Sequence, residues 1–185
     1  MTALVYLQKK GKVSLYYKIS YIIPMKGVWN KPRIVFVTWA IVELVGWLAT
    51  HYWPDPRVNW VWLVLTIIGF IPMVLYMPMK SVKLRKIMVL WIVAVGFGMV
   101  VSFLVFMVPR IMWLISYLGV FWLLLMGVAF LVNARWWTPR LFIIGGVVQI
   151  AAGLLPLFIP GLLYYQYLIA AAAGSGGMLI LVPNK

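Results

Sequence analysis

The residue with the clearest capacity for chemistry in this sequence is Glu43, which stands at the centre of an apolar run over residues 34–53. It is the only carboxylate inside any of the long apolar runs, because Asp55 falls just beyond this one. A charged side chain at the middle of a membrane costs about 2.5–3.5 kcal/mol on insertion scales and usually faces the interior of a helix bundle. Since no Lys or Arg lies at its depth, we expect Glu43 to be a protonated or proton-exchanging carboxyl.

Two further polar residues are expected at a depth similar to that of Glu43. Counted from the ends of the apolar runs, Gln149 in the fifth run and Thr66 in the second both lie near the membrane midplane. Glu43, Thr66 and Gln149 therefore form a predicted intramembrane polar cluster. It would act as a proton or cation relay, or as a buried carboxyl that fixes helix packing. A relay normally needs several ionisable steps and the chain offers one, which favours the packing interpretation.

The other residue types exclude most enzyme and cofactor chemistry. Cysteine is absent and His51 is the only histidine, which leaves no ligands for thiolate, haem or His-rich metal sites. The sequence has no HExxH motif, no phosphate-binding GxxxxGK motif and no acidic cluster for Mg²⁺. We therefore expect no metal site, no cofactor and no catalytic activity.

Composition predicts a membrane protein. Of the 185 residues, 66% are hydrophobic and 10% are charged, whereas about a quarter are charged in an ordinary soluble domain. Apolar runs long enough to cross about 30 Å of hydrocarbon predict an all-α membrane fold with six transmembrane helices. These runs cover residues 34–53, 58–79, 87–108, 111–132, 141–159 and 161–182.

The basic residues predict the orientation. With the N-terminus in the cytoplasm, 14 of the 16 Lys and Arg residues fall on the inner side, against Arg57 and Arg110 outside. Their place at membrane boundaries argues against nucleic-acid binding and favours contact with anionic lipid headgroups. We expect a multi-pass protein of the cell membrane with both termini cytoplasmic. The expected outer interfacial anchors are Tyr52, Trp53, Trp60, Trp62, Trp113, Tyr164 and Tyr165.

Short outer connections, at residues 54–57, 109–110 and 160, predict three helical hairpins. The hairpins begin 53 and 54 residues apart, at Ile34, Ile87 and Leu141. A glycine follows each start at a similar depth, at Gly46, Gly98 and Gly153. This threefold repeat indicates either duplication or the chance similarity of apolar sequences.

Small residues predict where helices approach closely, either within the bundle or between subunits. The predicted packing positions in the last two runs include Gly146, Gly153, Gly174 and Gly177. A homo-oligomer, or a complex with other membrane subunits, is therefore expected.

Residues 1–33 are expected to form a basic cytoplasmic or interfacial segment ahead of a transmembrane domain over residues 34–185. Within residues 13–23 apolar and polar side chains alternate with a period of two, which is typical of a strand. A short β-hairpin is one interpretation. The other is an interfacial helix whose basic residues face anionic headgroups.

The spacing of Gly146, Gly153 and Pro160-Gly161 resembles the glycine, glycine, proline-glycine pattern of the HdeD-type family. That family consists of small six-helix bacterial and archaeal membrane proteins associated with acid resistance. The length, the basic N-terminus and the hairpin repeat are similar to it as well, and the resemblance covers mainly the last hairpin. It implies a stress-linked membrane protein without known catalysis, and it transfers no functional residue.

These features together predict a non-enzymatic polytopic membrane protein that acts through interactions, as a small bundle or as a subunit of a membrane complex. The alternative is a small proton or cation channel or transporter that uses Glu43.

Overall fold

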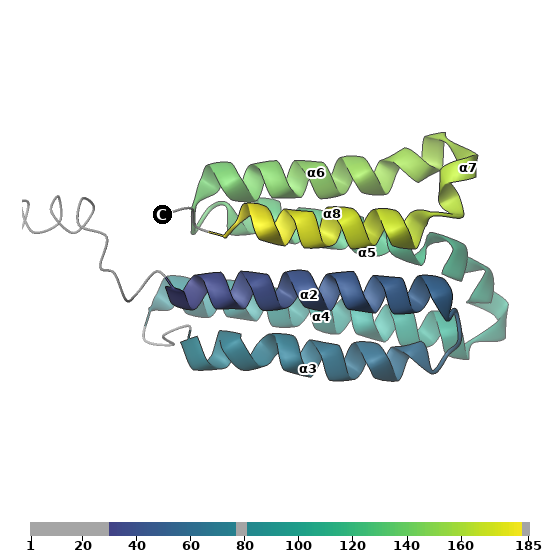
Figure 1. Cartoon of the computed structure of the whole chain (residues 1–185), viewed down its shortest axis with the longest axis horizontal. Coiled ribbons are helices and arrows are strands. Elements are labelled where there is room, and N and C mark those ends of the chain that lie inside the picture. The colour runs from purple at the N-terminus through teal and green to yellow at the C-terminus, as the bar shows by residue number, and fades with distance from the viewer. Residues whose placement is uncertain (1–29, 77–80, 183–185) are drawn as a thin grey trace, which may run out of the picture.

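The computed structural model describes residues 30–76 and 81–182, and every regular element within these ranges is a helix. The long helices lie side by side in an elongated bundle (Figure 1). In chain order the elements are α2 (Asn30–Tyr52), α3 (Val58–Tyr76), α4 (Val82–Met107), the 3₁₀-helix η1 (Pro109–Tyr117), α5 (Leu118–Asn133), α6 (Pro139–Phe158), α7 (Pro160–Leu163) and α8 (Gln166–Ile180). The predicted N-terminal β-hairpin lies outside the described residues.

Five helical stretches are long and apolar enough to cross a membrane, namely α2, α3, α4, η1 with α5, and α6. The structure thus confirms the all-helical class and is consistent with a membrane protein. The sixth predicted run is divided into α7 and α8 at Tyr164 and Tyr165. α8 has 15 residues, fewer than the roughly 20 that cross a bilayer.

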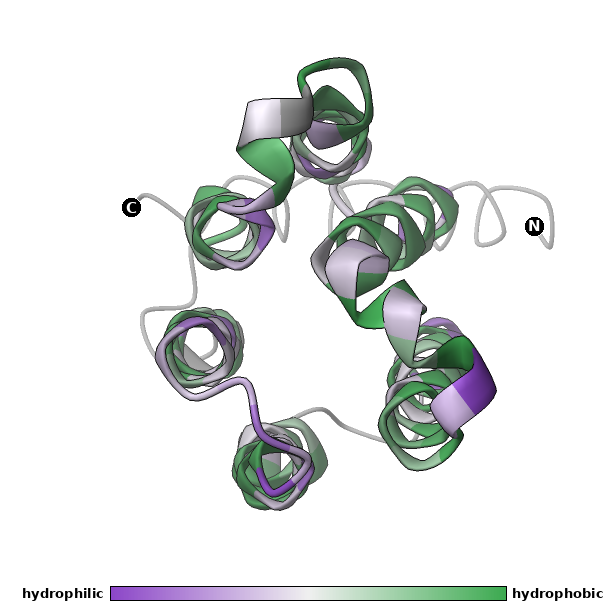
Figure 2. Ribbon diagram, turned by 90° about the vertical axis from the view of Figure 1, so that its right-hand side faces the viewer, coloured by the Kyte–Doolittle hydropathy of each residue, from purple (hydrophilic) through white to green (hydrophobic). Residues whose placement is uncertain are grey.

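The helices stand around a common centre, as the end-on view shows (Figure 2). Consecutive helices pair as α2 with α3, α4 with η1 and α5, and α6 with α8. The closest packing joins these pairs to one another, since α5 lies along α6 and α8 lies along α2. α3 and α4 also lie next to each other but have much less contact than the pairs named above. α3 is the least buried of the five long stretches.

The turn between α2 and α3 is closed by Asp55. Its carboxylate accepts hydrogen bonds from the guanidinium and from the backbone N–H of Arg57, both at 2.8 Å. The guanidinium, and after it the N–H, lower the pKa of this exposed carboxyl. Pro54 and Pro56 flank it and have no backbone N–H to continue the ladder of α2. α2 therefore ends at Tyr52.

Gln166 explains why the fourth predicted span begins as η1 rather than as an α-helix. In a continuous α-helix the N–H of Gly119 would donate to the carbonyl of Ile115. It donates instead to Oε1 of Gln166 at 2.8 Å, and Nε2 of Gln166 donates to the carbonyl of Ser116 at 2.6 Å. The hydroxyl of Tyr167 donates to the carbonyl of Ile115 at 2.7 Å. Side chains of α8 thus replace backbone bonds where η1 meets α5.

Gln166→Leu is expected to lower the melting temperature of the detergent-solubilised protein. The substitution leaves the Gly119 N–H and the Ser116 carbonyl without their buried partner, and an unsatisfied group of this kind costs about 1–3 kcal/mol. Tyr164→Phe changes an exposed residue just before α8 and serves as the control. Equal melting temperatures for the two variants would contradict a stabilising role for the Gln166 bridge.

Candidate functional site

Glu43 lies on the buried face of α2. Its neighbours on that face follow at spacings of three or four residues, as one side of a helix requires: Trp39, Trp47 and Thr50. Glu43 is 5% exposed, and its carboxylate accepts a hydrogen bond from Nε1 of Trp47 at 2.6 Å. The carboxylate rests against Gly174 of α8, where a Cβ atom would lie 3.0 Å from Oε2. Gly174 thus leaves the space that the carboxylate occupies.

Gln149 reaches the same face of α8 from α6. Its amide rests against Gly177, where a Cβ atom would lie 2.6 Å from Nε2. Because Gly174 and Gly177 are three residues apart, they share one face of α8, and Glu43 and Gln149 meet neighbouring positions on it. Thr66, the third predicted member of the cluster, is half-buried on α3. Within the described residues no hydrogen bond joins Thr66 to the other two.

The other two predicted packing glycines lie between α5 and α6. A Cβ atom at Gly146 would lie 2.9 Å from the carbonyl oxygen of Gly127, and one at Gly153 would lie 3.0 Å from Cβ of Leu123. These contacts let the backbones of α5 and α6 approach closely. Gly174 and Gly177 leave room for side chains instead, since Glu43 of α2 and Gln149 of α6 pack against α8 at these two positions.

Trp47 joins Glu43 to aromatic rings from three other helices. Its indole is buried and its ring centroid lies 4.8 Å from that of Trp62 on α3, 6.3 Å from Trp122 on α5 and 5.8 Å from Tyr167 on α8. Aromatic pairs at such separations contribute about 0.5–1.5 kcal/mol each beyond area burial. Trp47, Trp62, Trp122 and Tyr167 are called the aromatic cluster below. The carboxylate of Glu43 orients the ring that all the others touch.

Trp62 of α3 packs against Gly46 and Thr50 of α2. These three residues are called the first tryptophan contact. A Cβ atom at Gly46 would lie 2.5 Å from the indole ring, so only glycine leaves room for it. The indole N–H donates to the hydroxyl of Thr50 at 2.9 Å. That hydroxyl donates in turn to the carbonyl of Gly46 at 2.8 Å. The indole N–H and the hydroxyl hydrogen of this contact therefore both have an acceptor.

The second tryptophan contact, made by Gly98, Ser102 and Trp122, repeats the first. A Cβ atom at Gly98 would overlap the indole ring, whose N–H donates to the Ser102 hydroxyl at 2.9 Å. The Ser102 hydroxyl donates to the carbonyl of Gly98 at 2.9 Å. Gly98 and Ser102 follow their counterparts by 52 residues, and Trp122 follows Trp62 by 60. The first two helix pairs thus share a structural repeat.

The third helix pair lacks this contact. Gly153 occupies the corresponding place in the sequence repeat, but the residue four positions later is Leu157, which has no hydroxyl. Gly153 instead packs against α5, at Leu123. The repeated glycine therefore serves ring packing in two pairs and helix packing in the third.

The aromatic cluster was not predicted from the sequence. Trp62 was expected among the outer interfacial anchors, yet it is partly buried and turned toward α2. The other six expected anchors are exposed, and their place at the membrane interface stays a prediction: Tyr52, Trp53, Trp60, Trp113, Tyr164 and Tyr165. The available signal was the pair of Gly-x-x-x-Thr/Ser sequences, each followed by a tryptophan in the next helix.

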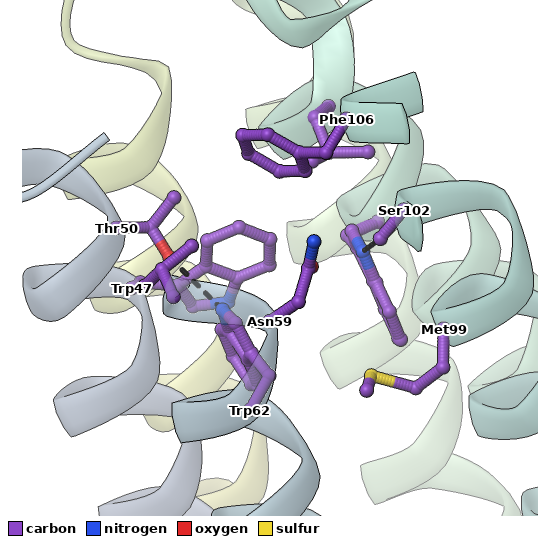
Figure 3. A pocket seen from close by; sticks show the side chains of 10 residues that line it. Trp47, Thr50, Asn59, Trp62, Met99, Ser102 and Phe106 are labelled. Atoms are coloured by element: carbon purple, nitrogen blue, oxygen red, sulfur yellow. Dashed lines mark hydrogen bonds between the residues drawn. The ribbon is translucent and has the colours of Figure 1, made fainter. Parts of the chain in front are cut away.

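A small pocket lies between α2, α3, α4 and α5, beside both tryptophan contacts (Figure 3). Its volume of about 10 Å³ is that of roughly one water molecule. Asn59 is 1% exposed and points into it, and its Nδ2 has no hydrogen-bond partner among the described residues. A second cavity of about 20 Å³ is lined mainly by apolar side chains of α2, α3, α4 and α8. Side chains of α3 and α4, which have few contacts with each other, contribute to both linings.

The chemistry available at this site is proton exchange at Glu43, hydrogen bonding and attraction of cations to aromatic rings. Within residues 30–76 and 81–182, no three His, Cys, Asp or Glu side chains gather in a way that could hold a metal ion. No family model, characterised protein or solved structure matches this chain. The functional argument therefore depends on the site itself.

Gly98→Ala is expected to lower the melting temperature, because the added Cβ atom overlaps the ring of Trp122 and overpacking costs about 1–3 kcal/mol. Gly96→Ala is the matched control on the same helix, since its Cβ atom would meet nothing within 4 Å. Alanine is favoured over glycine in a helix by up to about 1 kcal/mol, so this control should be neutral or stabilising. Thermal unfolding in detergent compares the two, and equal losses would contradict the second tryptophan contact.

Proposed function

We propose that the chain is a six-span membrane protein in which the start of α2 and the end of α8 face the cytoplasm. The sixth span would consist of α7 and α8, which together cover residues 160–180 and match the roughly 20 residues that a span requires. Basic residues at one end of the bundle support this orientation: Lys83, Arg85, Lys86, Arg135 and Arg140. Membership of the HdeD-type family stays a prediction.

We infer further that the protein moves protons or small monovalent cations across the membrane and is not an enzyme. The observation that carries this proposal is the place of Glu43, a carboxyl buried inside the bundle. Within the described residues its only side-chain hydrogen bond comes from Trp47, and no Lys, Arg or His pairs with it. A carboxyl without a fixed counter-charge is free to exchange a proton or to pair with a mobile cation.

The surroundings of Glu43 favour transport over a packing role. Trp47 donates to the carboxylate and also lines the pocket beside the tryptophan contacts. That pocket lies between α2, α3, α4 and α5, and α3 and α4 have few contacts with each other. Trp47 thus contacts both the carboxyl and the pocket, and this contact supports a transport role. The sequence favoured an interaction role, and we propose the alternative, transport, on the strength of these contacts.

A second function, as a subunit of an oligomer or a membrane complex, is favoured by α3. This helix is the least buried of the five long stretches and has little contact with α4. A transmembrane helix of a partner would find an accessible apolar face there.

Single-cysteine labelling tests the six-span topology, because the chain contains no cysteine of its own. In intact cells a membrane-impermeant maleimide is expected to label Asp55→Cys and Gly161→Cys. Ser81→Cys and Thr138→Cys should react only after permeabilisation. Labelling of Gly161→Cys and Thr138→Cys from the same side would contradict the six-span topology, in which α6 spans the membrane between these two positions.

Proton flux into liposomes, driven by a potassium diffusion potential and followed with an enclosed pH-sensitive dye, tests transport. The wild type is expected to conduct, and Glu43→Gln is expected to fall to the level of protein-free liposomes because its amide cannot exchange a proton. Asp55→Asn is the matched control, since it makes the same change at the other carboxylate of the chain. It should keep wild-type flux.

Two results would contradict the transport proposal. The first is equal flux through the wild type and Glu43→Gln. The second is no flux through a folded wild type, and a defined oligomer in the same preparation would then support the subunit function instead.

A further inference from the structure

The pocket beside the tryptophan contacts is lined by electron-rich groups. Rings of the aromatic cluster surround it, and the sulfur of Met99 and the ring of Phe106 complete its sides (Figure 3). The indole faces carry the negative side of the ring quadrupole and attract cations. No Lys, Arg or His lines the pocket, so nothing there repels a positive charge.

The hydrogens of the polar groups around this pocket are almost all used within the protein. The indole N–H groups of Trp47, Trp62 and Trp122 donate to Glu43, Thr50 and Ser102. The two hydroxyls donate to backbone carbonyls of their own helices. Each hydroxyl oxygen has two lone pairs and uses one of them for an indole, so one remains. The pocket therefore presents acceptors and π electrons.

Asn59 is the exception and supplies an independent sign of a ligand. Its side chain lies between those of Thr50 and Ser102 in the close-up view, and its amide nitrogen has no partner (Figure 3). An unpartnered buried N–H costs about 1–3 kcal/mol, and in this orientation the amide needs a partner that accepts its hydrogen. Rotation of the amide by half a turn exchanges its nitrogen and oxygen, so Asn59 can present an acceptor instead.

Size and bonding together select among cations. The cavity accommodates about one water-sized species. A dehydrated metal cation needs a shell of oxygens such as a ring of carbonyls. This pocket offers the hydroxyl oxygens of Thr50 and Ser102, aromatic faces and, once the Asn59 amide is rotated by half a turn, Oδ1 as a third oxygen. An ammonium ion is similar in size to water, and its N–H groups can be satisfied by three oxygens and a π face.

We propose that this pocket binds an ammonium ion, NH₄⁺, or its small primary derivative methylammonium. The inference deepens the proposed function, because it names the cation that the carboxyl of Glu43 would accompany. Binding and transport remain separable, since the pocket and the carboxyl involve different side chains apart from Trp47. A variant that loses ammonium binding need not lose proton transport, and a variant that loses transport need not lose binding.

Ammonium binding is tested by isothermal titration calorimetry and by melting temperature in detergent, with NH₄Cl compared with NaCl and KCl at equal ionic strength. NH₄Cl and methylammonium chloride are expected to release or absorb binding heat and to raise the melting temperature, because a ligand of the folded state stabilises it. NaCl, KCl and the larger tetramethylammonium chloride should do neither. Equal effects of all the salts would overturn the proposal.

Ser102→Ala and Ser175→Ala form the matched pair of variants. Both remove a helix hydroxyl that donates to the carbonyl four residues earlier, but only Ser102 lines the pocket. Ser102→Ala is expected to lose the ammonium response, and Ser175→Ala should keep it. Asn59→Leu, of similar size, repeats the test if Ser102→Ala does not fold.

Retention of the full response in both pocket variants would overturn the site. Proton flux through the wild type without any ammonium response would also overturn it, and would leave the proposed transport function standing.

Discussion

The packing of indole rings into positions kept open by glycine is the constraint on which the rest of this structure depends. Lipid gives no hydrophobic drive for helices to associate, so close packing and internal hydrogen bonds must hold them together. Gly46 and Gly98 provide the space, and Thr50 and Ser102 provide the acceptors that an indole N–H needs in a water-free interior. Each glycine lies one helical turn before its hydroxyl, so a single helix face supplies both the space and the bond.

The same constraint connects the aromatic cluster to the carboxyl. Trp47 is surrounded by rings from α3, α5 and α8, and its N–H is directed at Glu43. An indole in this position needs an acceptor, and a carboxyl in the bundle needs a donor, so each offsets the cost of burying the other. Gly174 then leaves room for the carboxyl beside α8. The group that could move a proton is thereby part of the packing that holds the helices together.

The helices of the bundle are not equally closely packed. α5 approaches α6 through Gly127 and Gly146, and α2 approaches α8 at Gly174. α3 and α4 have much less contact, and side chains of both helices contribute to the lining of each cavity. The cavity that holds the Asn59 amide thus lies beside one of the less closely packed helix pairs.

The sequence by itself determined the helical class, the main helix breaks and the burial of Glu43, because apolar length, proline and charge act through local or solvent energetics that composition already fixes. It could not determine which apolar residues face the centre, since lipid and protein interior are equally apolar and leave no amphipathic contrast to read. Trp62 therefore looked like an interfacial anchor, and only the glycine on the neighbouring helix turned it inward. Gln166 likewise gave no sign that it would interrupt a helix 47 residues earlier, at Gly119. The orphaned amide of Asn59 is also a product of tertiary packing, because a polar side chain becomes unpartnered only when other helices enclose it.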